Sequence, residues 1–317
     1  MLIIGISRFN QVQADQFLGS QADASPFGKI WYVDVTNGSD GNAGDAPDQA
    51  FASIGQAITA GSATRGDHVV IYPGTYTITS ALSPKAFMTF KAAVLNPQAP
   101  SVSVRGNLAT LVNVDVDGTR WIGVEFRATG TTARDLVRLA DTTAITGGVT
   151  FEDCVFHGAD QSPGSSLDGV CGLWVADPTN AVTGLVVRRC LFRDLGHTHI
   201  DVGVNGMPYG KIEDNVFAID TPTGGGIFMA DTAAFGTGKG YIIRNNEFLG
   251  PDAGTSGNLG IVIAGTQDAT SIGIIRTNYF AFIRDVAVTQ DKVAGGVINN
   301  YLGNNAGGVL VDPSAGA

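Results

Sequence analysis

Apolar and polar residues alternate in several short segments in the second half of the chain, and one arrangement recurs. Each copy begins with an apolar stretch of period two, continues with a polar residue followed by Asn or Cys, and ends in Phe or Leu. The copies are VTFEDCVF (149–156), LVVRRCLF (185–192), GKIEDNVF (210–217), YIIRNNEF (241–248), GIIRTNYF (273–280) and GGVINNYL (295–302). Period-two alternation rich in β-branched residues predicts strands. Recurrence at spacings of 22 to 36 residues predicts a solenoid.

Stacking of these units places equivalent residues on top of one another, about 4.8 Å apart. The closing aromatic residues are expected to form an internal column, made of Phe156, Phe192, Phe217, Phe248 and Phe280. A second column is expected from the amides, because buried amides need hydrogen-bond partners; it consists of Asn215, Asn246, Asn278 and Asn300. Cys154 and Cys190 occupy the Asn position in the first two copies, so we interpret them as small buried residues.

The outward-facing positions support this register. The residue four positions before the closing aromatic is charged, mostly with alternating sign: Glu152, Arg188, Glu213, Arg244 and Arg276. In a parallel stack these residues become vertical neighbours, which favours opposite charges. A second apolar strand follows each copy after a Gly-rich corner, as tight turns require. Residues 29–317 are therefore interpreted as one solenoid domain.

The segment before the first coil predicts a cap. Residues Phe51, Ile54, Ala57 and Ile58 lie at helical spacing, and a short amphipathic helix there would cover the exposed strand edges at the end of the coil. The preceding loop contains Asp34, Asp40, Asp45 and Asp48. These carboxylates either bind calcium or satisfy local backbone groups, and the spacing does not match an EF-hand.

Residues 1–28 show no convincing periodicity. Phe9, Phe17 and Phe27 are scattered among polar residues. The segment is interpreted either as a plain terminal tail or as an extended N-terminal arm whose aromatic residues attach the coil to another protein.

Composition excludes some functions. The net charge of −10 argues against nucleic-acid contact and suits an acidic outer surface or a cationic partner. No apolar run is long enough for a membrane span, and the N-terminus has no secretory signal pattern. Cys154, Cys171 and Cys190 give no disulfide framework. The alternatives are a bond between Cys154 and Cys190, which would come near bonding distance if their turns are adjacent, and free interior thiols, which we expect because small buried Cys is common.

The stretch WYVDVTNGSDGNAG…PDQAFASIGQAI…GDHVVIYPGTY (31–76) resembles the entry to right-handed parallel β-helix proteins of the pectate-lyase-like superfamily. With the repeats, the resemblance covers about residues 30–312. It implies an all-β, single-stranded right-handed β-helix of about nine or ten turns with a short N-terminal capping helix. The whole chain, including the run DQFLG (15–19), resembles more loosely the β-helix proteins encoded among the structural genes of tailed bacteriophages.

No catalytic signature emerges from the residues. The superfamily includes polysaccharide lyases and glycoside hydrolases, and hydrolysis needs two carboxyl groups about 5–10 Å apart. The Asn-Thr-Asp, Asp-Asp and Gly-His-Gly motifs that a polygalacturonase-like chain would show do not occur. The calcium-binding carboxylate cluster of a pectate lyase has no counterpart beside Arg188, Arg244 and Arg276, which the charge column explains.

The segment HTHID (197–201) is the most suggestive local feature. Alternation predicts His197, His199 and Asp201 on one face, where they would bind zinc or nickel, serve acid–base chemistry with Asp194, or simply form an outward polar face or a trimer contact.

Other polar and aromatic candidates carry weaker signals. His68 and His157 lack ligand-like companions and are interpreted as ordinary residues. Asp160 and Asp168 lie in a long corner that would shape a glycan groove or be solvated. Of the tryptophans, Trp121 is expected in the core, Trp31 beside the cap, and Trp174 is the candidate for stacking on a sugar.

These observations lead to a main hypothesis: a non-enzymatic virion structural protein on the particle surface, a homotrimer held by residues 1–28 on other virion proteins, with no cofactor. The alternative is a glycan-binding or polysaccharide-degrading spike that acts on the host surface. A bacterial adhesin is a third hypothesis, which the missing export signal disfavours.

Overall fold

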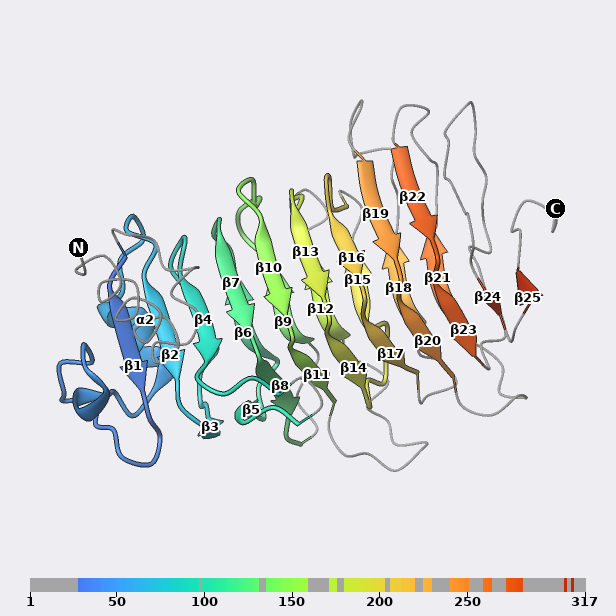
Figure 1. Cartoon of the computed structure of the whole chain (residues 1–317). Coiled ribbons are helices and arrows are strands. Elements are labelled where there is room, and N and C mark those ends of the chain that lie inside the picture. The colour runs from blue at the N-terminus through green and yellow to red at the C-terminus, as the bar shows by residue number, and fades with distance from the viewer. Residues whose placement is uncertain are drawn as a thin grey trace, which may run out of the picture.

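The computed structural model describes residues 28–96, 99–130, 135–158, 171–175, 180–202, 206–219, 225–229, 240–250, 259–263, 272–281, 305–306 and 309–310. Three sheets run along one elongated coil, and the strands follow one another in chain order from β1 at the N-terminal end to β23 near the other end (Figure 1). Most turns of the coil contribute one strand to each sheet. The fold is therefore a parallel β-helix of about nine or ten turns, as predicted.

Sheet A has nine strands in stacking order: β1 (Ile30–Val33), β2 (His68–Ile71), β4 (Thr89–Ala92), β7 (Thr119–Ile122), β10 (Val149–Glu152), β13 (Leu185–Arg188), β16 (Lys211–Glu213), β19 (Gly240–Arg244) and β22 (Ile272–Arg276). Sheet B has ten strands: β3 (Gly74–Thr77), β5 (Val102–Gly106), β8 (Val124–Ala128), β11 (Val155–His157), β14 (Leu191–Arg193), β17 (Val216–Ala218), β20 (Glu247–Leu249), β23 (Tyr279–Ala281), β24 (Asn305–Ala306) and β25 (Val309–Leu310). Sheet C has six strands: β6 (Thr110–Val114), β9 (Asp135–Leu139), β12 (Cys171–Val175), β15 (Ile200–Val202), β18 (Gly225–Met229) and β21 (Leu259–Ile263). Among the described strands, only β24 and β25 pair antiparallel.

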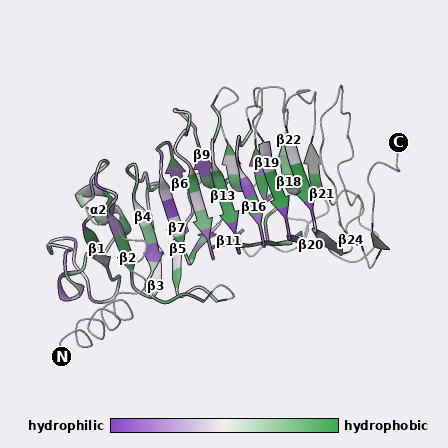
Figure 2. Ribbon diagram, turned by 45° about the horizontal axis from the view of Figure 1, so that its top comes forward, coloured by the Kyte–Doolittle hydropathy of each residue, from purple (hydrophilic) through white to green (hydrophobic). Residues whose placement is uncertain are grey.

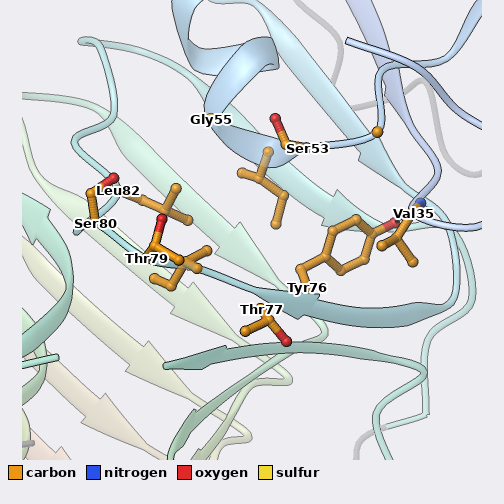
Figure 3. A pocket seen from close by; sticks show the side chains of 11 residues that line it. Val35, Ser53, Gly55, Tyr76, Thr77, Thr79, Ser80 and Leu82 are labelled. Carbon is orange, nitrogen blue, oxygen red and sulfur yellow. Dashed lines mark hydrogen bonds between the residues drawn. The ribbon is translucent and has the colours of Figure 1, made fainter. Parts of the chain in front are cut away.

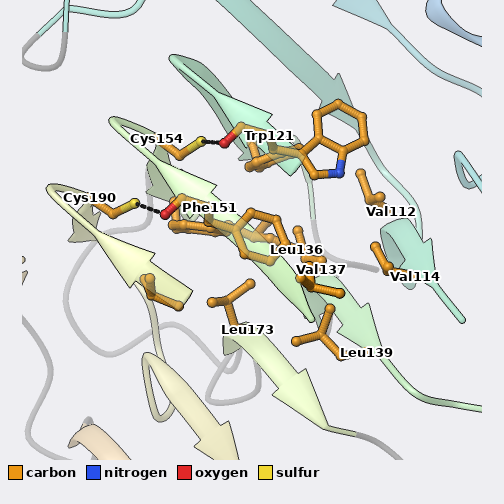
Figure 4. Packing of buried hydrophobic residues seen from close by; sticks show 14 of the residues in the cluster. Val112, Val114, Trp121, Leu136, Val137, Leu139, Phe151, Cys154, Leu173 and Cys190 are labelled. Carbon is orange, nitrogen blue, oxygen red and sulfur yellow. Dashed lines mark hydrogen bonds between the residues drawn. The ribbon is translucent and has the colours of Figure 1, made fainter. Parts of the chain in front are cut away.

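Alternation along the strands sorts side chains between the interior and the outer faces, and Figure 2 shows hydrophobic and hydrophilic residues following one another along many strands. In β10, for example, Val149 and Phe151 are buried while Thr150 and Glu152 are partly exposed. The buried residues form one core along the coil. Figure 4 shows part of it, with Trp121 and Phe151 from sheet A facing Val112, Leu136 and Leu173 from sheet C.

The predicted aromatic column is present. Ring centroids lie 4.5 Å apart for Phe156 and Phe192, 4.8 Å for Phe192 and Phe217, and 4.7 Å for Phe217 and Phe248, with nearly parallel planes. Phe280 follows Phe248 in register. Phe126 extends the column at the N-terminal side, 5.4 Å from Phe156. Close vertical stacking of large apolar rings is the main packing interaction of this part of the core.

The predicted amide column is also present. Asn215, Asn246 and Asn278 are buried, and each amide bonds the next: Asn215 Nδ2 donates to Asn246 Oδ1 at 2.9 Å, and Asn246 Nδ2 donates to Asn278 Oδ1 at 3.0 Å. Asn300 lies outside the described residues. Cys154 and Cys190 fill the same position and their thiols point to the carbonyls of Trp121 and Phe151 (Figure 4). The three cysteines carry no disulfide, as expected.

A left-handed backbone residue opens each of these corners between sheets A and B. The corner residues have φ between 52° and 58° and are Asp153, Arg189, Asp214, Asn245 and Thr277. Such values are uncommon outside glycine, with Asn and Asp enriched among the exceptions. The tight corner explains why the sequence shows a polar residue before the Asn or Cys in every described copy.

On the outer face of sheet A the predicted charge column is confirmed. Glu152 pairs in register with Arg188, and Glu213 with Arg244. Their charged atoms lie 2.6 Å and 2.9 Å apart. Arg276 follows Arg244 directly.

The N-terminal end of the coil carries the predicted cap. The helix α2 (Ile54–Ala60) buries Ile54, Ala57 and Ile58, and the Ser53 hydroxyl accepts a hydrogen bond from the Gln56 backbone as its N-cap. A short 3-10 helix, η2 (Pro47–Gln49), precedes it. In Figure 1, α2 lies beside β1 and β2. Residues 1–27, and with them Phe9, Phe17 and Phe27, lie outside the described residues, so the arm stays a prediction.

Asp67 fastens this end together although its side chain is fully buried. Its carboxylate accepts hydrogen bonds from the Lys29 and Ser62 backbone amides, from Trp31 Nε1 at 3.0 Å, and from the Arg65 guanidinium at 2.7 Å. Burial acts to raise the pKa of Asp67, but these bonds outweigh it and hold the pKa well below its usual value. Sequence reasoning did not single out Asp67.

Candidate functional site

The predicted common face of His197, His199 and Asp201 is wrong for His199. The strand β15 begins only at Ile200, so the alternation does not extend back through the corner before it. His199 is fully buried inside the coil, with its ring 6.2 Å from Phe192 and 5.9 Å from Phe217. Burial lowers the pKa of His199 to about 3. His199 is a core residue and cannot act on a ligand at the surface.

His197 and Asp201 do remain together, and Cys171 takes the place expected for His199. One ligand-type atom from each of these three residues lies within 4.8 Å of the others. The Sγ atom of Cys171 is 3.4 Å from Nδ1 of His197. Cys171 begins β12, and β15 pairs beside that strand, so the three side chains meet on the outer face of sheet C. We call this group the Cys171 cluster.

Neighbouring charges act on this cluster. Burial and the nearby carboxylates of Asp201 and Asp135 raise the pKa of the Cys171 thiol well above its usual value. Burial likewise raises the pKa of Asp201 to about 6; Asp135 adds to the rise and His197 opposes it. A nucleophilic cysteine needs a lowered pKa, so the arrangement does not suit thiol catalysis in the absence of a cation.

Asp194 belongs to a different group from the one expected. Its Oδ2 atom lies 2.9 Å from Nε2 of His157 rather than beside His197. The other ring nitrogen, Nδ1, lies 3.1 Å from Glu125 Oε1. The interpretation of His157 as a residue without companions is therefore wrong. Glu125, His157 and Asp194, which we call the His157 triad, lie on and beside the outer face of sheet B.

The His157 triad is buried at its Glu125 end and exposed to solvent at its Asp194 end. Glu125 and His157 are almost fully buried, whereas the Asp194 side chain is 40% exposed. Burial acts to raise the pKa of Glu125, but hydrogen bonds from His157 and Ser103 and the charge of Arg105 lower it to about 2. A carboxylate that stays ionised at this depth fixes the orientation of the imidazole, since the ring donates to it.

Two arginines flank the His157 triad. Arg193 Nη2 lies 3.2 Å from His157 Nδ1 and 3.7 Å from Glu125, and Arg105 lies 3.8 Å from Glu125. The Arg193 side chain is 41% exposed. The surface around His157 therefore holds a partly exposed guanidinium on the Nδ1 side of the ring and an exposed carboxylate on the Nε2 side.

Both groups border one corner. Residues 194–199 connect β14 in sheet B with β15 in sheet C; Asp194 opens this corner and His197 lies within it. Beyond it on sheet C, the ring of Trp174 is covered by the Arg138 guanidinium at 4.8 Å, and Arg138 also binds Asp135 at 2.8 Å. Trp174 is half-buried on the outer face, and Trp121 is in the core as expected.

The other candidates do not form a site. Asp34 and Asp40 accept hydrogen bonds from backbone amides and nearby side chains, and Asp45 lies 3.5 Å from Lys29, so this loop uses its carboxylates locally. Within the described residues, the Cys171 cluster alone has the composition and spacing of a metal site. Asp160 and Asp168 lie outside the described residues.

Two pockets open elsewhere on the coil. The first, about 230 Å³, lies between the cap helix and β3; Figure 3 shows Tyr76, Thr77 and Thr79 around it. It lacks charged lining residues, and the Tyr76 hydroxyl already donates to backbone carbonyls. The second, about 330 Å³, is mostly apolar and lies beside Tyr209, Tyr241 and Lys211. Neither pocket has a carboxylate or a histidine among its lining residues. No helix in the described part of the chain is long and apolar enough to cross a membrane.

Comparison with known proteins bears on the fold. No protein-family model matches the chain, and no curated protein matches it. Among solved structures, the pectin methylesterase from Aspergillus niger is similar with 15% identity and a TM-score of 0.52, covering 90% of this chain and 87% of that one. A variant of the PL6 family alginate lyase AlyGC is similar with 14% identity and a TM-score of 0.53; 87% of this chain matches 39% of the lyase. The chain therefore has the right-handed parallel β-helix fold of the pectate-lyase-like type.

Proposed function

We propose that this protein binds an acidic polysaccharide across the outer face of sheet B and cleaves it by elimination beside Asp194. The observation that carries the proposal is the His157 triad, in which an exposed carboxylate is held by a buried histidine whose other nitrogen faces a second, buried carboxylate. Such a chain of groups positions a proton acceptor at a surface.

Arg193 supports the choice of an acidic sugar. Its guanidinium is partly exposed on the Nδ1 side of His157, opposite the ring nitrogen that faces Asp194, and can form paired hydrogen bonds with a carboxylate. The chain as a whole has a net charge of −10, so a local cationic group is needed to hold a polyanion here. The two similar structures are named for pectin and alginate, which supports a polysaccharide as the ligand.

The exposure of the carboxylates favours elimination over hydrolysis. Hydrolysis places two carboxyl groups on either side of the glycosidic bond. Of the two carboxylates in the His157 triad, Asp194 is open to solvent and Glu125 is buried behind His157. Elimination needs one base and one group that neutralises the sugar carboxylate, and Asp194 and Arg193 supply these.

The reaction balances without an added reagent. Asp194 takes the proton from the carbon next to the sugar carboxylate, the electrons of that C–H bond form a carbon–carbon double bond, and the bond to the neighbouring sugar oxygen breaks. The proton then passes from Asp194 to the leaving oxygen. Arg193 stabilises the negative charge that develops on the sugar carboxylate, and His157 acts as a positioning residue for Asp194.

Incubation of the full chain with polygalacturonate or with alginate tests the proposal. Formation of unsaturated uronate ends, followed by their ultraviolet absorbance, is expected for one of these polymers. Asp194→Asn should reduce the rate at least 100-fold, and His157→Gln about 10- to 100-fold. Asp214→Asn, an exposed corner residue away from the site, is the matched control and should keep the rate.

Each of the alternative outcomes contradicts a different part of the proposal. Binding of a polymer without new double bonds would reject elimination and keep the binding role. An unchanged rate in Asp194→Asn would reject this site, and the absence of both binding and cleavage would reject the function.

The virion role that the sequence resemblance implies is a separate proposal. It is supported by that resemblance and by the scattered aromatic residues of the segment 1–28. A particle-bound protein that binds host polysaccharide would combine the two proposals, with the segment at one end serving attachment and the coil serving recognition.

A further inference from the structure

The Cys171 cluster is independent of the groups used in the proposed function. It lies on sheet C, and none of its three ligand atoms belongs to the His157 triad. We propose that Cys171, His197 and Asp201 form a binding site for a divalent transition metal of the zinc class.

The geometry fits such an ion. With Zn–S of about 2.3 Å and Zn–N of about 2.0–2.1 Å, tetrahedral coordination separates sulfur and nitrogen by about 3.6 Å. The Sγ atom of Cys171 and Nδ1 of His197 are 3.4 Å apart. All three ligand atoms lie within 4.8 Å of one another, and closing the widest gap needs a movement of at most about 1.5 Å. His197 is exposed and Asp201 half-buried, so their side chains are free to make these movements.

Different structural elements supply the ligands and hold them in place. Cys171 begins β12 and is buried, Asp201 lies in β15, and His197 comes from the corner that precedes β15. The pairing of Trp174 with Asp201 fixes the register of these two neighbouring strands, which are adjacent in Figure 1. A site anchored on paired strands keeps its ligand geometry better than one built on loops alone.

The ligand chemistry selects the ion. A thiolate, an imidazole and a carboxylate together suit Zn²⁺, whereas Ca²⁺ and Mg²⁺ prefer oxygen ligands throughout. Asp135 lies in register beside Cys171 and adds negative charge close by. Binding would replace the proton of the Cys171 thiol with the metal ion and release that proton to solvent.

Three protein ligands leave one tetrahedral position open to water, as in catalytic rather than structural zinc sites. The expected occupant of the fourth position is therefore a water molecule or an oxygen atom of a bound ligand.

Titration of the metal-free full chain with Co²⁺ and Zn²⁺ tests the inference. We expect one equivalent of Co²⁺ to bind, with visible bands of tetrahedral cobalt and a thiolate-to-cobalt charge-transfer band in the near ultraviolet. One equivalent of Zn²⁺ should remove both. Cys171→Ser should remove the charge-transfer band, and His197→Ala and Asp201→Asn should each weaken binding at least 100-fold.

Cys154→Ala is the matched control, because it removes another buried thiol that points to a backbone carbonyl. The Cys154→Ala variant should keep both the visible cobalt bands and the charge-transfer band. Zn²⁺ should raise the melting temperature of the wild type and of this variant alike. Circular dichroism of each variant shows that it is folded. Octahedral cobalt without a charge-transfer band, or a band that persists in Cys171→Ser, would overturn the inference. His157→Gln should bind Co²⁺ normally, which separates this site from the proposed polysaccharide site.

Discussion

The side-chain amide of Asn215 donates a hydrogen bond to Oδ1 of Asn246 at 2.9 Å, although the two residues are 31 positions apart in the chain. Asn246 repeats this relationship with Asn278, and its Nδ2 atom also donates to the Ile212 carbonyl. Each side-chain amide therefore provides hydrogen-bond partners for polar groups of a buried corner and fixes the register of the next turn. The column connects successive turns of the coil through polar contacts as well as apolar ones.

Replacement of Asn246 by Ala should destabilise the protein strongly. The change removes the Oδ1 atom that accepts from the Asn215 backbone and side-chain amides and the Nδ2 atom that donates to the Ile212 carbonyl, at a cost of about 2–4 kcal/mol. Chemical denaturation measures the loss. Asn245→Gly is the control, because the Asn245 side chain is exposed and glycine readily adopts the left-handed backbone conformation at this position. A loss in Asn246→Ala no greater than in the control would show that the column is dispensable.

Asp67→Asn should weaken the N-terminal cap by about 2–4 kcal/mol, because a neutral amide replaces a buried carboxylate that pairs with Arg65. The pKa of Asp67 is lowered in the folded state, so its contribution is complete above the unfolded value of 3.8 and is lost as the pH falls below it. The gap between wild type and variant should therefore narrow below about pH 4.

Denaturation at pH 6 and pH 3 measures this gap. The surface variant Asp45→Asn, which removes only an exposed pair with Lys29, should cost less than about 1 kcal/mol. A gap for Asp67→Asn that stays constant down to pH 2 would contradict the assignment.

His199→Leu should stabilise the protein by about 1 kcal/mol at pH 7, since the ring nitrogens of this buried histidine have no hydrogen-bond partner among the described residues. The pKa of His199 is about 3 in the folded protein and 6.5 in the unfolded chain. As the pH falls, the unfolded chain therefore binds a proton before the folded protein does. Wild-type stability should fall by up to about 1.4 kcal/mol per pH unit below pH 6.5, and the variant should lack this part of the loss. Parallel stability curves for the two proteins between pH 7 and 5 would refute this account.

Under the proposed virion role, deletion of residues 1–28 should leave a folded coil that no longer attaches to the virion. Among the described residues, the buried core begins at Trp31. Circular dichroism and melting test folding, and co-sedimentation with particles tests attachment. Normal incorporation of the shortened chain would count against the arm.

The coil could be predicted from the sequence because each repeat shows period-two alternation and places the same residue types at equivalent positions, which stack into columns. Phe192 and Asn246 could be assigned to columns since each copy places them at the same step from the corner. Phe126 was missed from the aromatic column because Gly123 and Val124 replace the polar residue and the Asn or Cys of the later copies.

The candidate site was harder to predict, because it depends on contacts between turns. His157 and Asp194 lie in consecutive turns, and their distance depends on the lengths of the corners between strands. His199 was misplaced because strand alternation was extended into a corner. Cys171 offered one signal, its position at the start of the strand that precedes HTHID, but alternation within a segment cannot show which residue of the next turn lies beside it.

The structure of the protein with a bound uronate oligosaccharide tests the central claim most directly. The account predicts that a sugar carboxylate contacts the Arg193 guanidinium and that the adjacent carbon lies within reach of the Asp194 carboxylate. A saccharide bound only at the apolar pocket beside Tyr209 and Tyr241, with Arg193 and Asp194 untouched, would contradict it.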